Sequence, residues 1–175
     1  MTIAFDSCIL IAGIQRKDHR KAFIERCDQY LHKLQSERAK VVLPTPAAWE
    51  LLAGYPTERI PDIARVLQKH FRFAPFNLHA AEIAAKIQIA HGLRVVESET
   101  GKRPRSNSLV VLKASRQQVK VDIAVLSSAI AAHADTLVTD DGKEFEKFQR
   151  WADGWPIVIS QVPKGDPQKL LEFET

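Results

Sequence analysis

Several acids in this sequence stand beside apolar residues, where an uncompensated carboxylate is costly. Asp6 follows the short apolar, β-prone segment 2–5, and Asp140-Asp141 follows a second one at 136–139. Glu50 and Asp122 lie in apolar helical surroundings, at 47–52 and 121–126. Clustered carboxylates with few nitrogen or sulfur ligands favour a hard cation such as Mg²⁺ or Mn²⁺. A divalent metal site is therefore the chemistry that these residues predict.

Glu50 and Asp122 each have a second interpretation. Glu50 sits past the first turn of its predicted helix, so it is either a ligand or a solvated edge position. Asp122 either binds the ion or interacts with the positive end of its helix. The residues alone leave both alternatives open.

Short apolar segments alternate with amphipathic ones, which predicts the elements that would position these acids. Strands are predicted at 2–5, 41–43, 72–76, 136–139 and 157–159, and helices at 7–15, 18–38, 45–54, 60–71, 77–91, 121–134 and 144–150. Thr45 and Asn77 are expected to cap two of these helices. The alternation predicts an α/β fold with three layers, α/β/α, around a mostly parallel central sheet. Sites in such sheets form beyond the carboxyl ends of the strands.

Residues 1–175 are expected to form a single domain, with a basic loop insertion around 98–118 and a charged C-terminal tail from about 161. The cations before Asp122 are Lys102, Arg103, Arg105, Lys113, Arg116 and Lys120. They either neutralise the phosphates of an RNA or simply form an exposed, solubilising insertion. The net charge of +4 is only a mild bias toward polyanions.

Other patterns exclude some classes of protein. No apolar run is long enough to span a bilayer and no basic leader precedes Asp6, so a cytoplasmic location is expected. Nucleotide-dependent dehydrogenases and P-loop ATPases are disfavoured because the chain has no glycine-rich phosphate loop. Cys8 and Cys27 are expected to be free thiols, and Cys8 has no recognisable histidine partner for nucleophilic catalysis. Trp49 is expected in the core, and Trp151 and Trp155 in the packing of the tail.

The order of the acidic segments resembles the PIN-domain family, most closely the VapC-type toxin ribonucleases of bacterial toxin–antitoxin systems. The matching segments are Ile3-Ala4-Phe5-Asp6-Ser7-Cys8-Ile9-Leu10, Trp49-Glu50-Leu51-Leu52, Asp122-Ile123-Ala124 with Ala129-Ile130-Ala131, and Leu137-Val138-Thr139-Asp140-Asp141 with Phe145. They cover nearly the whole chain in the family's order. The stretch before Asp122 departs from compact members because it is longer and more basic.

The resemblance implies a role for each residue. Asp6, Glu50 and Asp122 would bind Mg²⁺ or Mn²⁺. The family pattern of Thr, any residue, then Asp selects Asp141 as the fourth acid, with Asp140 as the alternative. Ser7 and Thr139 would support the site by contacting its acids.

The function that the resemblance implies is a metal-dependent endoribonuclease. It would hydrolyse RNA phosphodiester bonds to leave a 5′-phosphate and a 3′-hydroxyl, and it would be a homodimer paired with a cognate antitoxin and with no membrane partner. One alternative is a PIN-like domain that only binds RNA or a protein. Another is a phosphatase of the haloacid dehalogenase type, which needs a second Asp where this chain has Cys8.

Overall fold

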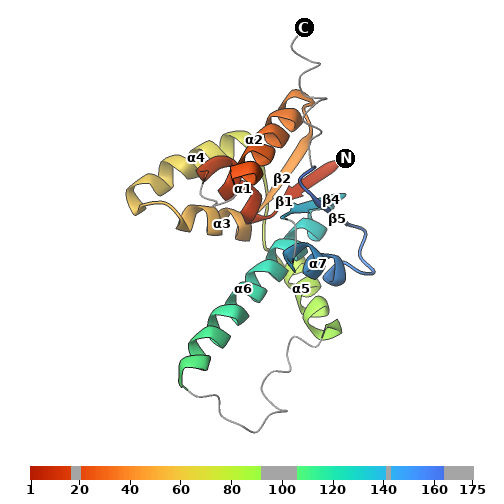
Figure 1. Ribbon diagram of the computed structural model, residues 1–175. Helices are drawn as coiled ribbons and strands as arrows, with labels where there is room; N and C mark the ends of the chain where they lie inside the picture. Colours follow the sequence, from red (N-terminus) through yellow and green to blue (C-terminus); the bar gives the residue numbers. More distant parts are fainter. Residues whose placement is uncertain (17–20, 92–105, 141–142, 164–175) are drawn as a thin grey trace.

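The computed structural model describes residues 1–16, 21–91, 106–140 and 143–163. Within these ranges, the side chains of 106–117 and 143–144 are not described. The described residues form one sheet covered by helices on two sides (Figure 1). None of the described helices combines the length and the apolar character needed to cross a bilayer.

The sheet consists of five parallel strands in the order β3-β2-β1-β4-β5. Their bounds are Thr2–Phe5 for β1, Lys40–Pro44 for β2, Arg72–Ala74 for β3, Thr136–Thr139 for β4 and Val158–Gln161 for β5. Each neighbouring pair is parallel, so the carboxyl ends of all the strands lie along one edge. This arrangement confirms the predicted parallel sheet.

Helices cover both faces of the sheet and complete the predicted three layers. Figure 1 shows α2 and α4 on one side and α5, α6 and α7 on the other. Their bounds are Ser7–Leu10 for α1, Lys21–Ser36 for α2, Thr45–Ala53 for α3, Ile60–His70 for α4, Leu78–Ala90 for α5, Ser106–Ala131 for α6 and Lys143–Trp151 for α7. A π-helix at Ile11–Gln15 continues α1, and a short 3₁₀ helix at Thr57–Arg59 precedes α4.

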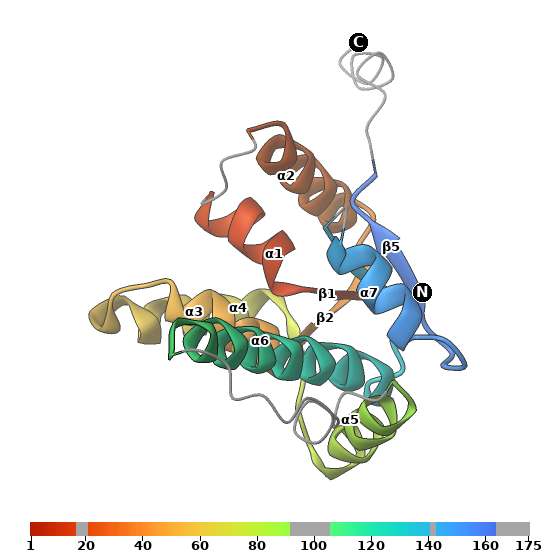
Figure 2. The same ribbon diagram turned by 60° about the horizontal axis from the view of Figure 1, so that its bottom comes forward.

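The core forms where these layers meet the central strand. All four residues of β1 are buried, as expected for a strand covered on both faces. Phe5 meets Tyr30 of α2 edge to face, with 6.2 Å between the ring centroids. On the other side, the second half of α6 is nearly continuously buried from Asp122 to Ile130. Figure 2 shows α6 beside both α3 and α5, and it contacts both helices.

Helix α6 corrects the predicted basic loop. It begins at Ser106, fifteen residues before the predicted start, so residues 106–118 are helical where a loop was expected. The physical reason is that residues 106–131 contain neither glycine nor proline, so nothing interrupts the helix before it ends at Ala131. Residues 98–105, the rest of the predicted loop, lie outside the described part of the chain.

The two predicted caps have different outcomes. Asn77 caps α5 as expected, because its Oδ1 accepts a hydrogen bond from the Ala80 amide at 3.0 Å. Thr45 does not cap α3. It is the first residue of that helix, and its Oγ1 accepts a hydrogen bond from the Phe76 amide at 3.1 Å, which ties the segment after β3 to α3.

Candidate functional site

The pairing of β1 with β4 brings Asp6 and Thr139 together, although they are 133 positions apart. Phe5 is paired with Val138, and the Asp6 amide donates to the Val138 carbonyl at 3.0 Å. Asp6 and Thr139 are thus side by side where the two strands end. The Thr139 hydroxyl donates to Asp6 Oδ2 at 2.8 Å, and both side chains are buried.

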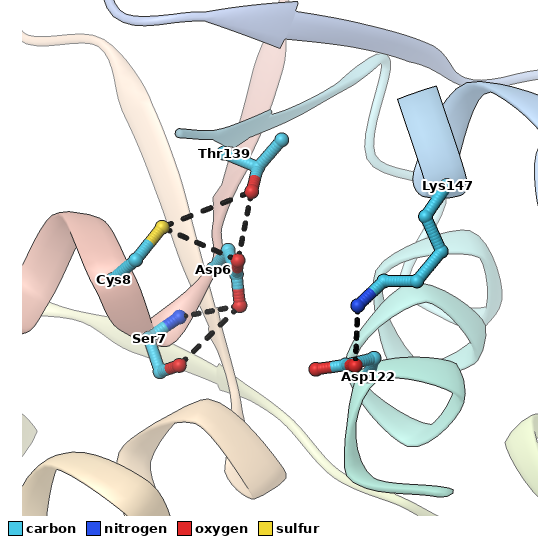
Figure 3. A network of polar contacts seen from close by, with 6 residues as sticks. All are labelled: Asp6, Ser7, Cys8, Asp122, Thr139 and Lys147. Carbon is cyan, nitrogen blue, oxygen red and sulfur yellow. Dashed lines mark hydrogen bonds and ion pairs between the residues drawn. The ribbon is translucent and has the colours of Figure 1, made fainter. Parts of the chain in front are cut away.

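The Asp6 carboxylate is held by donors from two elements (Figure 3). Its Oδ1 caps α1 by accepting from the Ser7 amide at 2.7 Å, with the Ser7 hydroxyl at 3.4 Å. Its Oδ2 accepts from Thr139 and from the Cys8 thiol, whose sulfur is 3.3 Å away. Ser7 and Thr139, which the sequence predicted as supporting residues, therefore both contact this acid.

Cys8 completes this group and is protonated at neutral pH. Burial raises the pKa of the Cys8 thiol well above its ordinary value, and the charge of Asp6 raises that pKa further. Asp140, whose charge acts in the same direction, directly follows β4 and is buried, so this acid also lies at the same edge of the sheet. A thiol that donates to Asp6 is a poor nucleophile, in agreement with the sequence-based interpretation.

Asp122 faces this group from α6. It is 6% exposed, and Figure 3 shows its carboxylate and that of Asp6 pointing into the same space between the end of β1 and α6. Lys147, from α7, donates to Asp122 Oδ2 at 2.7 Å. The alternative interpretation of Asp122 as a helix-end residue is wrong, because α6 begins at Ser106, about four turns earlier.

Glu50 is carried by α3, which packs against both α1 and α6. The helix that bears Glu50 is thus next to the helices that bear Ser7 and Asp122. The Glu50 side chain is half-buried, which fits a ligand as well as an edge position, so its assignment stays a prediction.

Trp49, beside Glu50, corrects another expectation. Its side chain is 55% exposed, whereas the sequence predicted a core position. The buried face of α3 is made instead by Ala47, Ala48 and Leu51. Trp151 is buried and Trp155 is partly buried against the core.

The donors at this edge suit a hard cation, since Asp6, Asp122 and Asp140 all offer carboxylate oxygens. Within the ranges that the structure describes, no group of three histidine, cysteine or acidic side chains is close enough to hold a metal ion as it stands. Asp141, the predicted fourth acid, lies outside those ranges. The structure therefore brings Asp6, Asp140 and Asp122 to one edge of the sheet without assembling a complete coordination shell.

Lys147 is the residue that sequence reasoning missed. Its position in the sequence is a weak indication that it lies near the core, because it stands one residue before Phe148 and four before Trp151, which are both buried. A lysine with that spacing lies along the edge of the buried face of its helix, close to the core.

The predicted RNA-binding cations are only partly described. Lys102, Arg103 and Arg105 lie outside the described residues, and Arg116 is in α6 without a described side chain. Lys120 is exposed on α6, two residues before Asp122.

Comparisons with known proteins identify the fold. Neither a family model nor a curated protein sequence matches this chain. Among solved structures, it resembles VapBC2 from Rickettsia felis bound to a DNA fragment from their promoter, with a TM-score of 0.56 and 15% identity over 93% of this chain and 100% of that one. It also resembles DNA-bound VapBC from Salmonella typhimurium, with a TM-score of 0.57 and 14% identity over 93% of this chain and 99% of that one. The chain therefore has a PIN fold of the VapC type.

Proposed function

We propose that this chain is a metal-dependent endoribonuclease and the toxin of a toxin–antitoxin pair. The observation that carries the proposal is the arrangement of Asp6 and Asp122, two buried carboxylates that face one space at the carboxyl edge of the sheet. The fold supports it, because solved structures that resemble this chain are VapBC complexes.

Asp6, Asp122, Glu50 and Asp141 would hold Mg²⁺ or Mn²⁺, with Asp140 as the alternative to Asp141. When bound, such an ion supplies a water of lowered pKa near the scissile phosphate and neutralises charge that develops on the phosphate oxygens.

The chain's own residues prepare the site for that ion. The Ser7 amide and the Thr139 hydroxyl each donate to a different oxygen of Asp6, which fixes the orientation of its carboxylate. The Cys8 thiol donates to the same oxygen as Thr139 and stays neutral, so it adds no further negative charge. Burial of Asp6 and Asp122 keeps bulk water away from both acids and strengthens their attraction for a cation.

Lys120 and the cations of 102–116 would contact the phosphates of the RNA. Because phosphate contacts release counterions, binding should weaken as salt rises. Neutralising Lys102, Arg103 and Arg105 together should lower the salt slope by up to about 2, at about 0.7 per phosphate on a single strand. An unchanged slope would reject RNA contact by these three residues.

An antitoxin and a second copy of this chain are the protein partners of the proposal. A cavity of about 680 Å³ between α2, β2 and α4 offers an apolar surface for a partner segment, lined in part by Leu31, Ile63 and Val66. Val66 is 52% exposed there, so a partner segment in this cavity would cover apolar surface.

Asp6→Asn tests the proposal, with Asp135→Asn as a matched control. Asp135 stands at the opposite end of β4, where it accepts from the Thr2 amide and is mostly exposed. Purified protein would be assayed on RNA with Mg²⁺, with Mn²⁺ and with EDTA, and its fold checked by circular dichroism. Cleavage by Asp6→Asn should fall by more than about 100-fold, because residues that merely support a metal ligand already change metal affinity or activity about 10- to 100-fold.

Four outcomes would contradict the proposed metal-dependent ribonuclease. Wild-type rates from Asp6→Asn, or cleavage that persists in EDTA, would reject the metal site. RNA binding without cleavage would favour a non-catalytic domain. Hydrolysis of small phosphate esters without RNA cleavage would favour the phosphatase.

A further inference from the structure

The ion pair between Lys147 and Asp122 has no role in the function proposed so far. The Lys147 ammonium is 2.7 Å from Asp122 Oδ2, and the two side chains are only 18% and 9% exposed. The Lys33–Glu37 pair, by comparison, is 65% and 54% exposed. The attraction within a pair that is shielded from water is screened less than in an exposed pair, and removing one partner leaves a costly buried charge.

Lys147 reaches Asp122 from a firmly anchored helix. Its ammonium lies 5.6 Å from the centre of the Phe148 ring and 5.5 Å from that of the Trp151 ring, within the range of a cation–π contact. Phe148 is fully buried and Trp151 nearly so, and their rings pack edge to face. The backbone of α7 is therefore fixed in this region, while the four-carbon stem of Lys147 allows its ammonium to move.

A divalent ion and this ammonium would need the same carboxylate. Mg²⁺ binds carboxylate oxygens at about 2.0–2.1 Å, so an ion on Asp122 would stand close to an ammonium that is 2.7 Å from one of its oxygens. Two cations so close to each other in a buried site repel strongly. Figure 3 shows the ammonium on the side of the Asp122 carboxylate that faces α7.

We propose that Lys147 is a built-in counter-cation that competes with the divalent ion for Asp122. It stabilises the buried carboxylate while the metal is absent, and metal binding displaces its ammonium. This inference rests on the proposed function, since it takes Asp122 as a metal ligand. Lys147 would thus act through Asp122, and its competition with the ion would set the metal affinity of the site.

The test measures the binding of Mn²⁺ alone, without RNA, by isothermal titration and by the electron paramagnetic resonance signal of free Mn²⁺. Lys147→Met removes the charge and keeps an apolar stem against Phe148 and Trp151. Lys147→Arg keeps the charge, and Lys33→Met removes an exposed lysine that also pairs with an acid. Melting temperatures are recorded for all four proteins with EDTA and with Mn²⁺.

Lys147→Met should bind Mn²⁺ about 10-fold more tightly than the wild type, a change of the size seen when contacts to a metal ligand are altered. The melting temperature of Lys147→Met should be lower than that of the wild type in EDTA, and it should rise more when Mn²⁺ is added. Lys33→Met should match the wild type in Mn²⁺ affinity and in both melting temperatures. A residue with only a structural role would give the opposite result, because its loss would loosen Asp122 and weaken Mn²⁺ binding.

Equal or weaker Mn²⁺ binding by Lys147→Met would overturn the inference and leave the proposed function standing, provided that the wild type binds Mn²⁺. If neither the wild type nor Lys147→Met binds Mn²⁺, the proposed function and the inference both fail. If Lys147→Met does not fold in EDTA, Lys147→Arg decides the question. A charged side chain should keep Mn²⁺ affinity within about threefold of the wild type, and a larger gain would overturn the proposal.

Discussion

Thr139→Val tests whether the hydroxyl at the end of β4 holds the Asp6 carboxylate in place. The Thr139 side chain is fully buried, and its Oγ1 donates to Asp6 Oδ2 at 2.8 Å. Valine has nearly the same shape as threonine, so the substitution removes the donor and changes the packing little. It also puts a methyl group against a carboxylate that is 5% exposed, where water cannot readily replace the lost donor.

The expected loss follows from the nature of this contact. A hydrogen bond to a charged group contributes about 1.5–3 kcal/mol to the free energy of unfolding. In a chain of this length, each 1 kcal/mol corresponds to about 2–4 °C in the melting temperature. Thr139→Val should therefore melt about 3–12 °C below the wild type.

Urea unfolding in metal-free buffer, followed by tryptophan fluorescence, measures this difference directly. Thr139→Ser is the matched control, because it keeps the hydroxyl and loses one buried methyl group, which costs about 1 kcal/mol. The loss caused by Thr139→Val should also shrink in an Asp6→Asn background, since the charged acceptor is then absent.

Two results would refute this reasoning. A Thr139→Val protein within about 0.5 kcal/mol of the wild type would show that the contact contributes little, because changes of that size are common at unimportant surface positions. Equal losses from Thr139→Val and Thr139→Ser would show that packing, and not the hydroxyl, holds the strand end.

Three further predictions concern the same fold. Because burial and Asp6 raise the pKa of Cys8, the folded thiol should react with iodoacetamide at pH 8 more slowly than a free thiol. Above about pH 8.5 the thiol ionises in the unfolded chain but not in the folded one. Stability should therefore fall as pH rises, and urea titrations of Cys8→Ser should lack that part of the fall. Asn77→Ala should lower the free energy of unfolding by about 1 kcal/mol in urea, because the bond to the Ala80 amide is lost. Phe148→Ala should lower it by about 3–5 kcal/mol, because the ring is fully buried.

Each of these predictions has an opposing result. Rapid alkylation of folded protein at Cys8 would contradict a raised pKa. Asn77→Asp should keep the capping bond, so a loss equal to that of Asn77→Ala would place the effect elsewhere. A Phe148→Ala protein as stable as the wild type would show that α7 does not depend on its buried ring.

The strand ends could be predicted because one physical rule governs them. An apolar β-prone segment followed by an acid places that acid beyond a buried strand, and this rule predicted Asp6 and the pair Asp140-Asp141. Asp6 and Asp140 do follow buried strands, while Asp141, the preferred fourth acid, lies outside the described residues. Parallel order then requires the two strand ends to share an edge. Only the pairing itself, which brings Thr139 onto Asp6, had to come from the structure.

Other features depend on neighbours that the sequence does not reveal. Trp49 is apolar, but Ala47, Ala48 and Leu51 already fill the buried face of α3. Thr45 is a good capping residue, yet its hydroxyl is used by the Phe76 amide. In both cases a tertiary contact outweighs the local preference of the residue.

Lys147 shows the same limit at the candidate site. Its charge predicts a solvated residue, while its place beside the buried Phe148 predicts one close to the core. Both expectations are reconciled by Asp122, a buried acid on α6 that pairs with the Lys147 ammonium. Asp122 is 25 positions earlier in the chain. No local pattern links two residues so far apart.

The central place of β1 has a consequence for how the protein is made. β1 precedes the other strands in the printed sequence, but it lies between β2 and β4 in the sheet, and Thr139 follows Asp6 by 133 positions. A ribosome must therefore translate the chain through β4 before these two residues can meet. Nascent or prematurely terminated chains carry the first acid without its partner strand. An activity that needs this pair therefore requires a chain that has been translated beyond β4.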